Sequence, residues 1–301
     1  MAMSTNDICT MITERVIAEL EKGRIPWEKP WIAPEGLCGA FNRISKKPYS
    51  ILNQILLGEP GEYASMKQWN ELGGKVRKGE KGNIVVFWKP YHKDVTAIDD
   101  ETNEEITKSV PFFILRYYYV FHIDQVEGVE PLKAEEDNPA NENKPLEKAE
   151  HILKNYTTHE GIKFVRSKTN QAFYKPSQDK IVVPNMKYFN SSEAFYDTAF
   201  HEMTHSTGHS TRLNRLDKKA SFGNEEYSKE ELVAEIGSAA LANYAGTSTE
   251  KTERNNTAYI QSWLRPLKED VRFIVSAAGK AEKAVEYILN AVKAQDEAVT
   301  E

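Results

Sequence analysis

The stretch His201-Glu202-Met203-Thr204-His205 is an HExxH sequence, and more of the fold and function follows from it than from any other part of the chain. Two histidines at this spacing project from the same face of a helix, so their imidazoles can hold one metal ion, for which the pattern predicts zinc. Glu202, beside the first histidine, can then act as general base on water activated by the metal. The alternative is a pair of histidines with ordinary structural partners on a helix.

The residues around this pentad predict the helix that it needs. Asn190 with Glu193 resembles a capping box, and Gly208 is a helix-stop signal one turn after His205.

A catalytic zinc takes a third protein ligand and leaves the fourth position to water. The pattern HExxHxxGxxH is not completed here, because Thr211 stands where a third histidine belongs. His209 is a weaker candidate, since it follows Gly208 directly and would need an unusual turn.

A better source of the third ligand is the predicted helix at Tyr227–Tyr244, where Glu231 and Glu235 lie one turn apart. In such a pair the first carboxylate can bind the metal while the second orients a ligand histidine. The small residues Ala234, Ser238 and Ala242 share their face, which predicts close approach of another helix. Two alternatives stay open: Glu235 is the ligand, or Glu231 is the N3 glutamate of a capping box in which Ser228 is the N-cap.

A zinc hydrolase also needs a group that stabilises a developing oxyanion or contacts substrate. The candidates near the motif are Tyr174, Tyr227 and Arg212, each with an alternative role in packing or in a salt bridge. The segment around Tyr174 also resembles a strand edge, which could pair with an extended peptide.

The first half of the chain is basic, although the whole chain carries a net charge of −6. Between Ala40 and Lys93 there are ten Lys and Arg against four Glu, a local balance of 10 − 4 = +6. Interleaved aromatic side chains could stack on unpaired nucleobases there, while the Lys and Arg side chains neutralise phosphates. The alternative is a solvated basic face with tryptophans in the core. The candidate DNA-binding residues are Lys47, Tyr49, Lys75, Arg77, Lys78, Lys81 and Trp88.

Patterning along the chain predicts an α+β protein with two domains, a small mixed α/β nucleic-acid-binding module followed by a metallopeptidase domain. The expected boundaries are 1–132 for the first domain, 133–150 for an acidic linker, and 151–301 for the second. Asp94–Ser109 is expected to be a hairpin tip or a flexible loop, and Phe112–Ile123 a long aromatic strand.

The amino-acid composition indicates the class of protein and its compartment. With 40% hydrophobic and 28% charged residues, the 301-residue chain is expected to be globular and soluble. The most apolar stretch, Val110–Phe121, is broken by Arg116 and is too short to span a bilayer, so no membrane partner is expected. Cys9 and Cys38 are expected to be free thiols in the cytoplasm.

Several segments together resemble ArdC-type antirestriction proteins, in the same order along nearly the whole chain. The N-terminal segments are Ile25–Trp31, Lys47–Tyr49 and Leu72–Trp88, and the C-terminal ones are Tyr174–Pro184, His201–Arg212, Tyr227–Leu241 and Tyr259–Leu267. The resemblance implies a single-stranded-DNA-binding module joined to a zincin-like metallopeptidase domain, a layout similar to Spartan-type DNA-dependent proteases. It also implies carriage by a mobile element and protection of incoming DNA from restriction. The chain departs from the pattern of this family in its acidic Asp94–Ser109 insertion and in its negative net charge.

The sequence therefore predicts a zinc peptidase that binds single-stranded DNA, with DNA-bound proteins as candidate substrates. Two other functions remain: a protein that shields DNA and holds a structural zinc, and a plain cytoplasmic zinc peptidase whose basic loop binds a protein.

Overall fold

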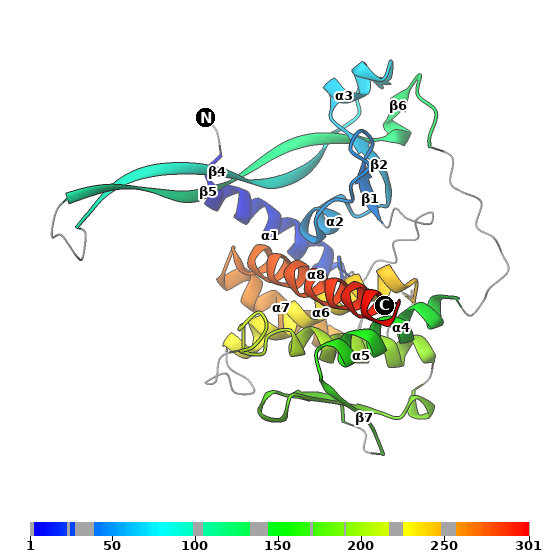
Figure 1. Cartoon of the computed structure of the whole chain (residues 1–301). Coiled ribbons are helices and arrows are strands. Elements are labelled where there is room, and N and C mark those ends of the chain that lie inside the picture. The colour runs from blue at the N-terminus through cyan, green and yellow to red at the C-terminus, as the bar shows by residue number, and fades with distance from the viewer. Residues whose placement is uncertain are drawn as a thin grey trace.

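The computed structural model describes residues 3–22, 25–27, 39–98, 105–132, 144–168, 171–189, 191–216, 225–247 and 257–300. The expected α+β class is confirmed, because helices and mixed sheets occur in both halves (Figure 1). No helix among these residues is long and apolar enough to cross a membrane.

The N-terminal half contains a four-stranded sheet in the order β1-β2-β5-β4, in which β1 and β2 are parallel and the other pairs antiparallel. A second pair, β3 with β6, lies beside α3. The elements are α1 (Thr5–Glu21), β1 (Ala40–Asn42), α2 (Ile51–Leu57), β2 (Gly61–Ala64), α3 (Met66–Glu71), β3 (Lys75–Val76), β4 (Asn83–Ile98), β5 (Glu105–His122) and β6 (Val126–Glu127).

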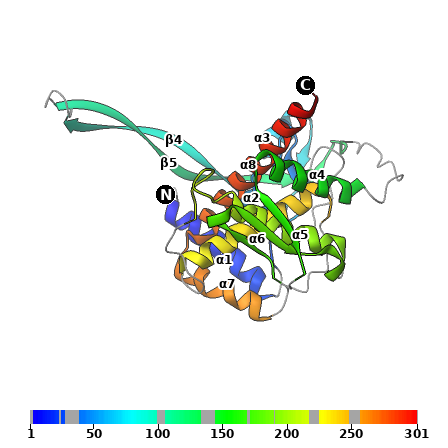
Figure 2. The same cartoon turned by 60° about the horizontal axis from the view of Figure 1, so that its bottom comes forward.

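The hairpin formed by β4 and β5 extends well beyond the body of the molecule (Figures 1 and 2). Its strands are paired from Asn83 with Val120 as far as Ile98 with Glu105. Most of the predicted Asp94–Ser109 excursion is therefore paired strand at the end of a hairpin, and residues 99–104 lie outside the described part of the chain.

The described part of the C-terminal half contains a three-stranded sheet in the order β7-β9-β8, and residues of α4, α5, α6 and α8 form a hydrophobic cluster with β9. The elements are α4 (Lys144–His159), β7 (Lys163–Ser167), β8 (Phe173–Lys175), β9 (Lys180–Pro184), α5 (Ser192–Ser206), α6 (Glu225–Ala245), α7 (Thr257–Glu269) and α8 (Phe273–Thr300). Since α4 begins at Lys144, part of the predicted linker is helical.

Residues of both halves form one of the hydrophobic clusters of the described chain, and the other clusters each lie within one half. α1 is capped by Ser4 and Asp7 and buries a helical stripe that includes Ile8, Ile12 and Val16. This stripe packs in a cluster with Val86 and Leu115 of the hairpin and with apolar residues of α6, α7 and α8. The two predicted domains are therefore not separate hydrophobic units, and cutting the chain at 132 would expose one face of α1 to water.

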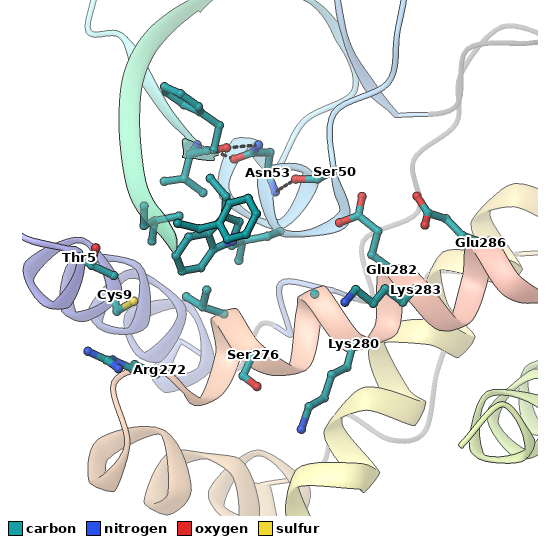
Figure 3. Close-up of a pocket in the computed structure, with 18 residues that line it drawn as sticks. Thr5, Cys9, Ser50, Asn53, Arg272, Ser276, Lys280, Glu282, Lys283 and Glu286 are labelled. Atoms are coloured by element: carbon teal, nitrogen blue, oxygen red, sulfur yellow. Dashed lines mark hydrogen bonds between the residues drawn. The ribbon is translucent and has the colours of Figure 1, made fainter. Parts of the chain in front are cut away.

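A pocket of about 960 Å³ lies at this junction, between the base of the hairpin, α1 and α8 (Figure 3). Asn53 of α2 fixes one wall, since its side-chain amide donates to the Val86 carbonyl and accepts from the Val86 amide, each at 2.8 Å. Lys280 of α8 lines this pocket and also a second pocket in the C-terminal half.

Candidate metal centre

The HExxH pentad lies in the last two turns of α5, as the sequence predicts. The predicted N-cap needs correction, because Ser191 caps the helix by accepting a 3.2 Å hydrogen bond from the Ala194 amide. Asn190 lies outside the described residues.

α6 approaches α5 closely where the small residues were predicted to allow it. A Cβ added to Gly237 would lie 2.6 Å from Cγ2 of Thr204, so the two helix surfaces meet there with no room for a methyl group. The Ser238 hydroxyl donates across the same contact to the Asp197 carbonyl at 2.7 Å. This packing brings the carboxylates of α6 to the histidines of α5.

Replacing Gly237 by alanine should therefore separate the two helices. Thr204 is fully buried, so overpacking should cost about 1–3 kcal/mol of stability and weaken metal binding. Thermal melting and a metal titration would measure both effects. Gly279→Ala in α8 is the matched control, because its new Cβ meets nothing within 4 Å and should leave metal binding intact. Equal metal affinity in the Gly237→Ala variant would contradict the proposed role of the close contact.

Three side chains from the two helices converge on one point. Nε2 of His201 and Nε2 of His205 lie 3.1 Å apart. Glu231 of α6 places one carboxylate oxygen 3.6 Å from the first nitrogen and the other 3.4 Å from the second. This set forms a candidate metal-binding group in the described part of the chain.

The separations fit a tetrahedral metal. Ligand atoms held about 2.0–2.1 Å from a tetrahedral zinc are about 3.3–3.4 Å from one another. The two histidine nitrogens are 3.1 Å apart, and each has a different Glu231 oxygen at 3.6 or 3.4 Å. Glu231 lies well inside α6, which begins at Glu225, so Ser228 is not an N-cap and the capping-box alternative for Glu231 is wrong.

A further carboxylate lies close to the other ring nitrogen, Nδ1, of each histidine. Glu235 Oε1 lies 3.4 Å from Nδ1 of His201, and Glu230 Oε1 lies 3.2 Å from Nδ1 of His205. A carboxylate can only accept, so Nδ1 of His205 carries the proton when that ring is neutral, and its Nε2 is left with a lone pair. Nδ1 of His201 is buried and makes no hydrogen bond among the described residues. Both Nε2 atoms and the Glu231 carboxylate face one another, an arrangement that suits a cation between them.

The pKa shifts of His205 and Glu231 in the metal-free site also favour a positive charge between these side chains. Burial by itself would lower the pKa of His205, but hydrogen bonds to Glu230 and Glu231 outweigh it and raise this pKa to about 10. Burial opposes ionisation of Glu231, yet hydrogen bonds from both histidines hold its pKa below the usual range. The donor set thus stabilises either a proton or a metal cation at its centre.

Arg215 completes the support behind His205. Its guanidinium donates two hydrogen bonds of 2.8 Å to Glu230 and a third to the Thr204 carbonyl. Glu230 is therefore fixed by Arg215 on one side while it orients His205 on the other. The sequence analysis missed both residues. Glu230 could have been suspected from its place beside Glu231 on the same helix, whereas nothing local marks Arg215.

Glu202 is buried beside the ligands in a pocket of about 590 Å³ that also contains His201, His205 and Glu231. Burial raises the pKa of Glu202, and the neighbouring histidines act in the opposite direction. The backbone N–H of Tyr174 donates to this carboxylate and also lowers its pKa. A carboxylate whose proton affinity is raised in this way suits transfer of a proton at neutral pH.

The remaining candidates for substrate contact differ in their surroundings. Tyr174 lines the same pocket, but its hydroxyl donates to Asp179 at 2.7 Å. The side chain of Arg212 is only 2% exposed, is hydrogen-bonded to Asp179 and Glu160, and does not line the pocket. This favours the salt-bridge alternative for Arg212. The Tyr227 side chain lies outside the described part of the chain.

His209 is not part of the ligand group. Its Nδ1 lies 2.8 Å from the Thr211 hydroxyl.

The candidate DNA-binding residues are spread over three places. Lys75 lies on β3, and Arg77, Lys78 and Lys81 lie in the loop between β3 and β4, where Arg77 is paired with Glu80 at 3.0 Å. Lys47 is exposed and Tyr49 half-buried in the segment before α2. The Trp88 ring is half exposed on β4 and lines the pocket shown in Figure 3.

Comparisons with known proteins give two family matches along the chain. Residues 6–121 match a family described as the N-terminal domain of anti-restriction factor ArdC, and residues 147–280 match one described as zincin-like metallopeptidase. The metal-free crystal structure of the antirestriction ArdC protein from plasmid R388 has a TM-score of 0.70 and 32% identity, with 95% of this chain and 98% of that chain covered. Its Mn(II)-bound structure gives 0.71 and 31% identity with the same coverage.

Curated relatives extend the comparison. An Escherichia coli DNA primase TraC is 34% identical over 295 residues, covering 92% of this chain, which spans only 26% of that protein's length. The Sinorhizobium fredii protein y4eC is 31% identical, covering 94% of this chain and 91% of its own.

Proposed function

The chain belongs to the ArdC family of antirestriction proteins, and we propose that it binds single-stranded DNA and hydrolyses peptide bonds at a zinc site formed by α5 and α6. The peptidase part of the proposal rests on the convergence of His201, His205 and Glu231 beside the buried Glu202. The similarity to an ArdC structure that is described as Mn(II)-bound supports metal binding by this chain. The donor set of two imidazoles and a carboxylate suits zinc.

A catalytic site is favoured over a structural one. A structural zinc is usually enclosed by four protein ligands, whereas the described residues supply three here and open onto a pocket. When bound, zinc would supply a Lewis acid that polarises a carbonyl and makes water more acidic. Glu202 would take the proton of the attacking water and pass it to the amide nitrogen as the C–N bond breaks.

Strand β8 gives the substrate a place to lie. It is an edge strand of the sheet β7-β9-β8, and Ala172, Phe173 and Tyr174 line the same pocket as the metal ligands. An extended peptide could pair with such an edge through its backbone, with the scissile bond near Glu202. Since an antirestriction role implies protection of incoming DNA, we also place the protein in the cytoplasm, with DNA-bound proteins as substrates.

The DNA half of the proposal predicts preferential binding to single strands. The full-length chain should bind a labelled single-stranded oligonucleotide more tightly than the matching duplex, with affinity falling steeply as salt rises. Fluorescence anisotropy over a salt series measures both properties. The full chain is required, because its two halves share a core. Equal or tighter binding to the duplex, or affinity that does not change with salt, would contradict the proposal.

A further inference from the structure

The strand register of the β4–β5 hairpin sorts its side chains into two chemically different faces. Residues directly opposite each other in an antiparallel pair lie on the same face, and successive residues alternate between faces. Phe87 opposes Arg116 and Tyr91 opposes Phe112, so these residues belong to one face. Trp88 opposes Leu115, and they belong to the other.

We call the first face the basic face, defined by Phe87, Lys89, Tyr91, Lys93, Phe112, Arg116 and Tyr118. Over the described stretches 84–95 and 109–119, all three Lys and Arg residues of the hairpin are on this face, and the one acid, Asp94, is on the other. No sequence window reveals this separation, because Lys89, Lys93 and Arg116 come together only through the register.

Aromatic rings lie between these cations. Tyr91 and Phe112 stack with their centroids 5.7 Å apart, and Phe87 meets Tyr118 edge to face at the same separation. Nζ of Lys89 lies 5.4 Å from the centre of the Tyr91 ring. Phe87 and Phe112 are each more than 40% exposed, which is unusual for such rings unless they have a partner.

The opposite face is used inside the molecule at its base. Val86 and Leu115 are buried in the shared core, and Trp88 and Phe113 line the pocket against α1 and α8, as does Phe87 from the basic face. At its own base the basic face meets Tyr49, which interacts with Tyr118. The exposed part from Phe87 to Lys93 is about 20 Å long, enough for several consecutive nucleotides.

We propose that the basic face of the β4–β5 hairpin is the platform on which single-stranded DNA binds, with its bases on the exposed aromatic rings and its phosphates on Lys89, Lys93 and Arg116. Stacking on a ring accepts any unpaired base, and cations without neighbouring carboxylates suit a polyanion. A duplex keeps its bases stacked inside and cannot use the rings. This inference rests on the single-strand binding proposed above and names the surface that performs it.

Adjacent phenylalanines offer a matched test, since Phe112 and Phe113 are both exposed but lie on opposite faces. In the full-length chain, Phe112→Ala should weaken single-strand binding about tenfold, while Phe113→Ala should change it less than twofold. Equal losses in the two variants would overturn the inference. Thermal melting of both variants checks that the fold is retained.

The cations are tested by the salt dependence of binding. A Lys89→Gln/Lys93→Gln variant should reduce the slope of log affinity against log salt by about 1.4, corresponding to about 0.7 for each lost phosphate contact. Lys75→Gln/Lys78→Gln removes the same charge from β3 and the loop after it and should have less effect. If the β3 variant lost more affinity, DNA would lie on that segment, and the inference would fail while single-strand binding stood. A wild-type chain that does not bind single strands would instead refute the proposed function itself.

Discussion

Replacing Glu231 by glutamine should remove the metal from the purified protein. Glu231 supplies one of the three converging ligands, and the neutral amide that replaces it is a far weaker partner for a dication. Metal affinity should fall by more than about 100-fold, beyond the range of about 10–100-fold usual for residues that only support a ligand. His201→Ala and His205→Ala should have effects as large. Metal content by mass spectrometry and a chelator competition would measure the change.

The supporting carboxylates provide the matched comparison. Glu230→Gln and Glu235→Gln each leave all three ligands in place and replace the charged carboxylate beside Nδ1 of one histidine by a neutral amide. Their affinities should therefore lie between those of wild type and Glu231→Gln. If Glu235→Gln lost the metal while Glu231→Gln kept it, the roles of the two carboxylates would be reversed.

The residues of the candidate ligand group could be predicted from sequence because helix periodicity places each pair on one face of its helix. Spacing places His201 and His205 on one face of α5, and the same argument places Glu231 and Glu235 on one face of α6. The small residues beside them predicted the close packing that Gly237 and Ser238 now show. Each inference needed only residues within two turns of a helix.

Features that depend on long-range pairing could not be predicted in this way. The basic face requires the register of β4 against β5, which brings Arg116 opposite Phe87 across a long hairpin. The shared core requires contact between α1 and α8, from opposite ends of the chain. The ion-pair partners of Arg212, Glu160 and Asp179, could not be predicted for the same reason, because both are distant in sequence.

Replacing Glu202 by glutamine should abolish peptide hydrolysis and leave both binding functions intact. Glutamine has nearly the same shape as glutamate, and its carbonyl oxygen can still accept the backbone N–H of Tyr174. It cannot take a proton from water, so the step that general-base catalysis accelerates should slow by at least about 100-fold and up to about 10,000-fold. Metal content and single-strand affinity should match wild type, because Glu202 belongs neither to the ligand group nor to the hairpin.

The decisive comparison sets wild type against Glu202→Gln on two substrates, the chain itself and a protein bound to single-stranded DNA, each with and without the DNA. Lys280 lines both the pocket at the hairpin base and the pocket at the metal centre, so DNA on the hairpin could influence the site through α8. Cleavage by wild type that needs DNA and disappears in Glu202→Gln would join the two halves in one activity. Protection from restriction that survives Glu202→Gln undiminished would instead mean that the DNA-binding half shields incoming strands without proteolysis. In that case the metal centre would not be needed for protection, although its ligands would still bind metal.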